Sequence, residues 1–192
     1  MARRRSDNHG DGTRGEKFVP LDRELLVRTA LSILSDEGLN HLSMRKLADS
    51  LDVKASALYW HIKDKHVLLQ LVADKICEEI QWSNEDITWQ EKVFFGMSSY
   101  RKALLRYRDS AEIFADTSPN TPNRKHLIKN LIETLMQCGF TPQESFMTSG
   151  LLNNYVIGFV MDELRISRRA DKIPPKNARV EQPPMDSLFQ HA

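Results

Sequence analysis

The residues of this 192-residue chain whose types and spacing indicate a binding function gather between Ser43 and Lys65. Leu58 and Ile62 lie four residues apart, as on the buried side of a helix, which leaves small, aromatic and basic residues on the outer side. Small residues let a helix approach base edges in the major groove of DNA, and hydroxyl, imidazole and ammonium groups can donate to phosphates. The candidate DNA-binding residues are Arg45, Lys54, Ala55, Ser56, Ala57, Tyr59, Trp60, His61 and Lys65.

Two helices around a tight turn must position these side chains. Ser43 can cap the first helix by accepting from free backbone N–H groups, and the turn falls at Asp52-Val53, where left-handed dihedral angles must be tolerated. The second helix is expected from Lys54 to Ile62, and an amphipathic helix from Leu21 to Glu37 completes a three-helix unit. Periodicity alone also allows an ordinary helical hairpin whose charges are a solvated face, so both interpretations remain at this point.

The sequence of this unit is similar to that of a known family. The run LSMRKLADSLDVKASALYWHIKDKHVLL resembles the helix-turn-helix of the TetR family of bacterial transcriptional repressors, and WQEKVFFGMSSYRKALLRYRDSAEIFADTSP resembles the ligand-binding domain of its tetracycline-binding members. The resemblance covers about Leu21 to Arg165. It implies a homodimeric repressor that binds a palindromic operator in double-stranded DNA, with half-sites about 34 Å apart, and that a small-molecule effector releases.

The chain departs from the family pattern in the helix-turn-helix and near its C-terminal end. Asp52 stands where the family usually has glycine, and Ala55 stands where the tetracycline-binding members have a glutamine that contacts a base, so we expect a different operator. The family's final dimerisation helix has no counterpart in the polar, proline-rich end of the chain. The resemblance places the dimer surface on the preceding long helix, although its apolar residues could equally face the core: Gly150, Asn153, Asn154, Ile157, Val160 and Met161.

The second half of the chain supplies aromatic and soft apolar residues that can form either a plain core or a ligand cavity. Together with the resemblance, they give as candidate ligand-binding residues Gln81, Gly96, Tyr100, Phe114, Thr117, Pro119, Phe146, Tyr155 and Asp162. Phe114 stands where the tetracycline-binding members have a histidine that ligates magnesium, and a phenyl ring cannot ligate a metal. We therefore expect no metal site, no cofactor, and an apolar or drug-like effector other than magnesium-tetracycline.

Composition limits the class of protein. The net charge is only +1, so DNA binding must rest on a local concentration of basic residues. No apolar run approaches the roughly 20 residues that span a bilayer, so we expect a cytoplasmic protein without a membrane partner. Cys77 and Cys138 lack metal-type spacing and are expected to be buried thiols. The histidines are scattered and no catalytic motif is present, so we expect no enzyme.

Apolar periodicity predicts helices throughout, and hence an all-α fold with an N-terminal helix-turn-helix domain and a helical ligand-binding and dimerisation domain. The expected segments are a flexible basic arm over 1–20, the DNA-binding domain over 21–66, the ligand-binding and dimerisation domain over 67–168, and a polar, proline-rich tail over 169–192. A connecting helix over 65–80 joins the two domains. The alternative function is a ligand-binding or protein-interaction module whose DNA-binding part is vestigial.

Overall fold

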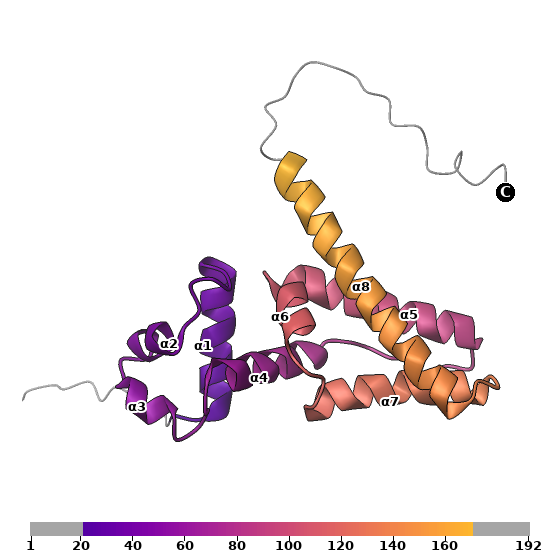
Figure 1. Cartoon of the computed structure of the whole chain (residues 1–192), viewed down its shortest axis with the longest axis horizontal. Helices are drawn as coiled ribbons and strands as arrows, with labels where there is room; N and C mark the ends of the chain where they lie inside the picture. Colours follow the sequence, from indigo (N-terminus) through magenta and orange to yellow (C-terminus); the bar gives the residue numbers. More distant parts are fainter. Residues whose placement is uncertain (1–20, 171–192) are drawn as a thin grey trace, which may run out of the picture.

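The computed structural model describes residues 21–170, and every regular element in this range is an α-helix. In chain order the helices are α1 (Arg23–Asp36), α2 (Met44–Ser50), α3 (Ala55–Leu58), α4 (Lys65–Cys77), α5 (Trp89–Arg106), α6 (Ser110–Asp116), α7 (Pro122–Gln137) and α8 (Pro142–Ala170). Figure 1 shows α1–α3 at one end, α5–α8 at the other, and α4 between them. The all-α fold class is confirmed. The predicted arm over 1–20 and residues 171–192 of the predicted tail lie outside the described residues.

Helices α1, α2 and α3 form a small unit around fully buried leucines. It is the unit that the sequence predicts to bind DNA, and it is called here the DNA-binding unit. Leu26 of α1, Leu47 of α2 and Leu58 of α3 have no exposed surface. Ser43 caps α2 as predicted, because its hydroxyl accepts from the backbone N–H of Lys46 at 3.1 Å. Gly38 follows α1 with a φ of 88°, a left-handed conformation that suits glycine and ends the helix.

The turn between α2 and α3 follows the prediction, but the length of α3 does not. Asp52 has a φ of 52°, the left-handed conformation expected there. A helix from 54 to 62 was predicted, and this prediction is wrong beyond Leu58. The chain leaves the regular helix because the N–H groups of both His61 and Ile62 donate to the Leu58 carbonyl at 2.9 Å, as in the tightened last turn of a helix.

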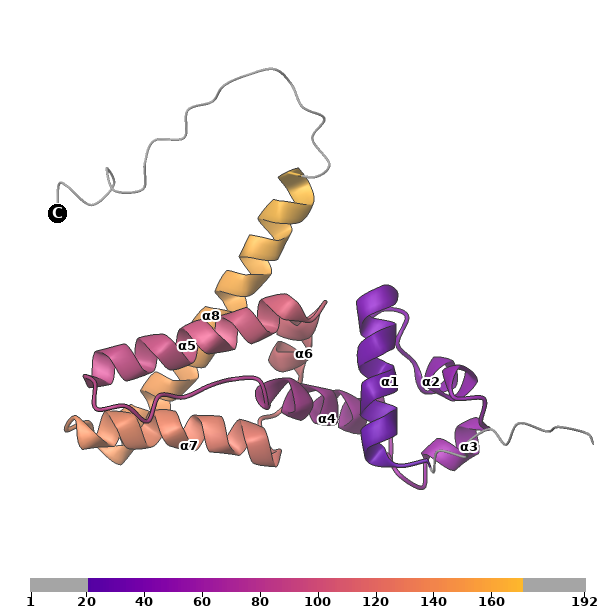
Figure 2. The ribbon, with the colours of Figure 1, turned by 180° about the vertical axis from the view of Figure 1, so that it is seen from behind.

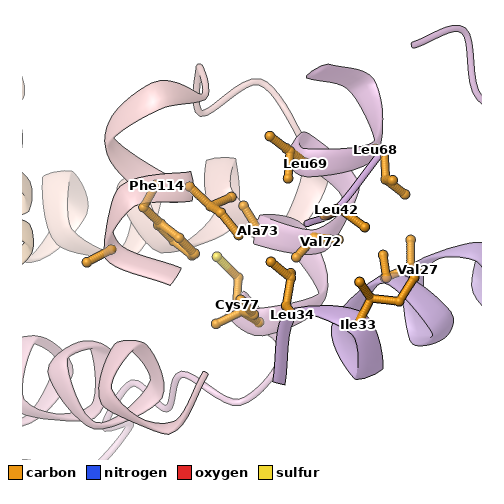
Figure 3. Close-up of a cluster of buried hydrophobic side chains, with 14 of the residues drawn as sticks. Val27, Ile33, Leu34, Leu42, Leu68, Leu69, Val72, Ala73, Cys77 and Phe114 are labelled. Carbon is orange, nitrogen blue, oxygen red and sulfur yellow. The ribbon is translucent and has the colours of Figure 1, made fainter. Parts of the chain in front are cut away.

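Helix α4 packs against both ends of the molecule. Leu69 and Val72 are buried in one apolar cluster with Leu34 of α1, and the same cluster continues through Cys77 to Phe114 of α6. Figure 3 shows Ala73 and Cys77 of α4 between Phe114 and Leu34 of α1. α4 ends at residue 77 rather than near 80, because the next N–H groups bond only three residues back. One continuous core therefore joins the two ends.

Helices α5 to α8 form the second part, in which α8 packs against α5, α6 and α7. Figure 2 shows the C-terminal part of α8 extending beyond these helices. A capping box begins α5: Thr88 N–H donates to Glu91 Oε2 at 2.9 Å, and Glu91 N–H donates to Thr88 Oγ1 at 3.3 Å. Arg101 of α5 holds Glu163 of α8 in a forked ion pair at 2.6 Å. None of the helices between residues 21 and 170 is both long and apolar enough to cross a membrane.

Two surface predictions need correction. Ile157 and Val160 were candidates for a dimer surface with a core-facing role as the alternative, and the structure buries both in the core, with exposed fractions of 6% and 0%. Cys77 is buried as predicted, but Cys138 is exposed. Cys138 lies at the end of α7, where its thiol donates to the Thr134 carbonyl at 2.9 Å.

Candidate functional site

The predicted DNA-binding residues fall into an exposed group and a half-buried group. Arg45 of α2, Lys54 and Ser56 are exposed. Tyr59 and Trp60 follow α3 directly and expose 54% and 89% of their surface, although both carry large aromatic rings. Because Leu58 beside them is fully buried, the apolar side of this segment is used by the core and its polar and aromatic side is left free.

The half-buried members lie closer to the protein. Ala55, Ala57 and His61 are partly covered, and the backbone carbonyl of His61 accepts from the Arg23 Nε–H at 3.1 Å. Lys65 was predicted to reach phosphate, but its ammonium lies 3.4 Å from the Leu39 carbonyl, to which it donates. These contacts fix the turn after α3 rather than extend side chains into solvent.

A cavity with a volume of about 260 Å³ lies among α4, α5, α6, α7 and α8. Five of the nine predicted ligand-binding residues line it: Gly96, Tyr100, Phe114, Pro119 and Phe146. Tyr100 and Phe114 pack with their ring centroids 5.5 Å apart, and the Tyr100 hydroxyl donates to Asn153 Oδ1 at 3.1 Å. The walls are mostly apolar with few polar groups, as in small-molecule sites generally.

The other four predicted residues lie outside this cavity. Gln81 lines a separate hollow, where its backbone N–H donates to Ser99 Oγ at 2.9 Å. Thr117 is buried in a neighbouring hollow. Tyr155 is 67% exposed in an outer groove between α5 and α8, and Asp162 is exposed and pairs with Arg165 at 3.0 Å. The structure therefore does not bring these four residues together with the other five in the cavity, and the turns of α8 carry Tyr155 and Asp162 onto its outer side.

Sequence reasoning missed Arg124, the charged residue of the cavity wall. Its exposed fraction is 4%, and its guanidinium carbon lies 4.7 Å from the centroid of the Phe114 ring. The signal was present in the sequence, since Arg124 precedes Leu127, Ile128 and Leu131 at helical spacing and so belongs to their apolar stripe. A basic residue on an apolar stripe marks a buried charge.

Trp82 was also missed, and it explains why residue 96 is glycine. A Cβ atom built on Gly96 would lie 2.1 Å from Cζ3 of the Trp82 ring, far inside van der Waals contact. The indole therefore occupies the space that a side chain at position 96 would fill, and it forms one wall of the cavity. A tryptophan in a polar connector between two predicted helices gives little sign of this role in sequence.

The titratable groups in the wall are neutral apart from Arg124. Burial raises the pKa of the Cys77 thiol to about 12 and raises the pKa of the Tyr100 hydroxyl as well, so both stay protonated at neutral pH. Burial is also the largest cause that lowers the pKa of Arg124. Within residues 21–170, no three His, Cys, Asp or Glu side chains gather closely enough to hold a metal ion.

Comparison with known proteins gives the same two parts. The family described as "Bacterial regulatory proteins, tetR family" matches residues 26–72, and "Tetracyclin repressor-like, C-terminal domain" matches residues 83–186. Tetracycline repressor protein class G of Vibrio anguillarum is 32% identical over 179 residues, which cover 91% of this chain and 82% of that protein.

Two solved structures share the fold. ActR, a TetR family protein of Streptomyces coelicolor in complex with (S)-DNPA, has a TM-score of 0.72 at 32% identity over 76% of this chain and 72% of that one. BioQ with its natural double-stranded DNA operator has a TM-score of 0.73 at 31% identity over 78% of this chain and 90% of that one. With the two family matches, these similarities show that the chain belongs to the TetR family of bacterial transcriptional regulators.

Proposed function

We propose that this regulator represses transcription by binding operator DNA as a homodimer, and that a small apolar or drug-like effector releases it. The observation that carries the proposal is the continuity of α4. Its buried residues pack against α1 of the DNA-binding unit, and its last residue, Cys77, lines the cavity. A ligand in the cavity therefore contacts the helix that supports the DNA-binding surface, as a two-state regulator requires.

A second connection runs through the turn before α6. Arg108 donates to the Asp36 carbonyl at 3.1 Å, and Asp109 Oδ2 accepts from the Leu39 N–H at 2.9 Å. The Asp36 carbonyl lies at the end of α1, and Leu39 lies in the loop that leads into α2. Because α6 begins at this turn and carries Phe114 into the cavity wall, a shift of α6 would also shift the end of α1.

The DNA-binding role is assigned to residues 21–66, and ligand binding and dimerisation to residues 67–168. Exposed Arg45 and Lys54 offer cationic donors to phosphate, and the exposed Tyr59 hydroxyl offers a neutral one. The BioQ structure, similar in fold, holds double-stranded DNA. Since Ala55 has no polar group with which to contact a base edge, the operator is expected to differ from one that a glutamine at this position would select.

The proposed dimer surface lies on the outer side of α8. Leu151, Tyr155 and Phe159 follow one another at four-residue intervals and expose 69%, 67% and 50% of their surface, so they form one apolar stripe. Such a stripe suits a two-fold interface in which the same surface meets its copy. Two DNA-binding units related in this way can contact half-sites about 34 Å apart on a palindrome.

The cavity wall supports an effector other than magnesium-tetracycline. Phe114 has no atom that can ligate a metal, and the Arg124 guanidinium lies against its ring. A positive charge at this place repels a divalent cation. DNA release by tetracycline that depends on magnesium would contradict this part of the proposal.

The test begins with a selection of binding sites from a pool of random duplexes, followed by sedimentation of the chain with the selected duplex. We expect a palindrome occupied by two chains. Leu151→Glu places a charge in the apolar stripe and should weaken the dimer on the order of a hundredfold or more, with a parallel loss of DNA affinity. Gln137→Glu, an equal charge change on an exposed position of α7, is the matched control and should change neither.

Two results would count against the proposal. A monomer that binds a single half-site with full affinity would contradict the proposed homodimer. A folded chain that binds small apolar ligands but selects no duplex would instead support the ligand-binding module with a vestigial DNA-binding part.

A further inference from the structure

We infer that the effector of this protein is an apolar molecule with one anionic group, such as an aromatic carboxylate, which pairs with Arg124 inside the cavity. The inference rests on the proposed function, because it names the class of ligand for the same cavity. It goes further by assigning the charge of that ligand and the residue that recognises it.

Arg124 places a full positive charge in an otherwise apolar wall. The side chain is 4% exposed and lines the cavity beside Leu127, Ile128 and Leu131 of α7. Burial lowers the pKa of the guanidinium, but the ordinary pKa of arginine is so high that the group stays charged at neutral pH. Any ligand that fills the cavity must therefore lie against this charge.

The protein forms hydrogen bonds with the two terminal nitrogens of this guanidinium but does not neutralise it in direct contact. Its terminal nitrogens donate to the Thr117 hydroxyl at 2.7 Å, the Thr117 carbonyl at 3.0 Å and the Phe114 carbonyl at 3.3 Å, all of which are uncharged. Among the described residues, no ion pair includes Arg124. The Asp74 carboxylate raises the pKa of Arg124 through its charge. It does not contact the guanidinium, and it accepts from the backbone N–H groups of Asn123 and Arg124.

These contacts hold the guanidinium in one place before any ligand arrives. Donation to Thr117 and Phe114 fixes its plane, and the Phe114 ring covers it at 4.7 Å. A buried charge without a contacting counter-ion is costly, and a carboxylate of a ligand would supply the missing counter-charge in a low-dielectric site. No hydrogen bond between described residues uses the Arg124 Nε–H, and Nη2 makes a single one, so this pair of N–H groups can meet a carboxylate.

The other residues of the cavity wall indicate the shape and polarity of the rest of the ligand. Ile80, Trp82, Met97 and Leu131 offer apolar surface, and the Tyr100 hydroxyl with Asn153 forms a small polar site on the neighbouring wall. The ligand is therefore expected to have a flat or compact apolar body, with the anionic group at the end that meets Arg124.

The experiment compares two probes of nearly the same shape, anthracene-9-carboxylate and anthracene-9-carboxamide, by fluorescence titration of the full chain at pH 7.5. The wild-type chain should bind the carboxylate about tenfold or more tightly than the amide, since hydrogen bonds to charged groups are stronger. Arg124→Met removes the charge and keeps an apolar stem of similar length, so it should abolish the preference and leave amide binding within about twofold.

Lys125→Met is the matched control, because it removes a positive charge from the neighbouring, exposed position of α7 and should keep the preference. The wild-type comparison needs no variant, so it decides the inference even if Arg124→Met fails to fold. Equal affinity for the two probes, tighter binding of the amide, or binding of neither at millimolar concentration overturns it. Binding of the selected duplex is measured separately on the same chain without probe. If the chain binds no duplex, the proposed function is overturned but the preference for the anionic probe is not.

Discussion

The proposed DNA-binding surface and the cavity place their charged groups in opposite environments. At the surface, Arg45 and Lys54 are exposed while Leu47 and Leu58 fill the interior. In the cavity, Arg124 is buried while the Phe146 ring on α8 is 67% exposed. Substitutions at the surface should therefore change DNA binding with little effect on stability, whereas substitutions in the cavity wall should change ligand binding and packing together.

The largest effect on stability is expected from Gly96→Asn. The new Cβ would overlap the Trp82 ring, so the indole must leave its place in the cavity wall. We expect a loss of about 2 to 3 kcal/mol in the free energy of unfolding, measured by urea denaturation, and a shift of the tryptophan emission towards that of an exposed indole.

Gly150→Ala is the control for this prediction. Gly150 lines the same cavity, but a Cβ there meets no atom within 4 Å. Because alanine is the better helix former, this variant should be more stable than the wild-type chain by about 0.5 to 1 kcal/mol. Equal losses in both variants would show that the close contact with Trp82 does not set the difference.

A smaller effect is expected where the two regions meet, at Asp109. Its φ of 57° is unfavourable for alanine, and its carboxylate accepts from Leu39 N–H and pairs with Arg168 at 3.0 Å. Asp109→Ala should cost about 1 to 2 kcal/mol and raise the hydrogen-exchange rate of the Leu39 amide. Asp116→Ala, at the exposed end of α6, should change neither quantity. An unchanged hydrogen-exchange rate of the Leu39 amide in Asp109→Ala would show that Asp109 does not connect the two regions.

The smallest predicted effect concerns pH and Cys77. Burial raises the pKa of this thiol to about 12, whereas an unfolded chain ionises it near its ordinary value of about 8.5. Stability from the neutral buried thiol is therefore complete below about pH 8.5 and is lost as pH rises towards 12, with a loss of about 1.4 kcal/mol at pH 9.5.

Urea unfolding with a reductant at pH 7.5 and 9.5 measures this loss. Between pH 7.5 and 9.5, the free energy of unfolding of Cys77→Ala should fall by about 1.4 kcal/mol less than that of the wild-type chain. Cys138→Ala should behave like the wild type, because residue 138 is exposed. An identical loss in Cys77→Ala would contradict the assignment.

The two regions also differed in how far sequence predicted them. In the DNA-binding unit, the signals lie within a few residues of their effects: Ser43 caps α2, Asp52 takes the left-handed turn, and Leu58 and Ile62 are buried. The early end of the regular helix at residue 58 was missed, because two N–H groups share one carbonyl there and composition does not reveal this.

The cavity was harder to predict because five helices build it. Which side of α8 faces inward depends on how this helix crosses α5, α6 and α7. Sequence alone therefore left Ile157 between the dimer surface and the core, and it did not show that Tyr155 lies on the outer side of α8. Trp82 enters through the space left by Gly96, a relation between a connector and a helix that neither segment shows alone. Arg124, by contrast, carried a readable signal in its helical spacing from Leu127 and Leu131.

The exposed side of the segment around α3 is proposed to bind DNA. Fluorescence anisotropy of the selected duplex tests this claim, in titrations at several salt concentrations with the wild-type chain and with the double variant Arg45→Ala, Tyr59→Ala. Because these side chains are exposed, the variant should keep the thermal stability of the wild type, bind DNA on the order of a hundredfold more weakly, and show a shallower dependence of affinity on salt. Lys125→Ala should bind like wild type. A folded double variant with unchanged affinity and salt dependence would contradict the claim.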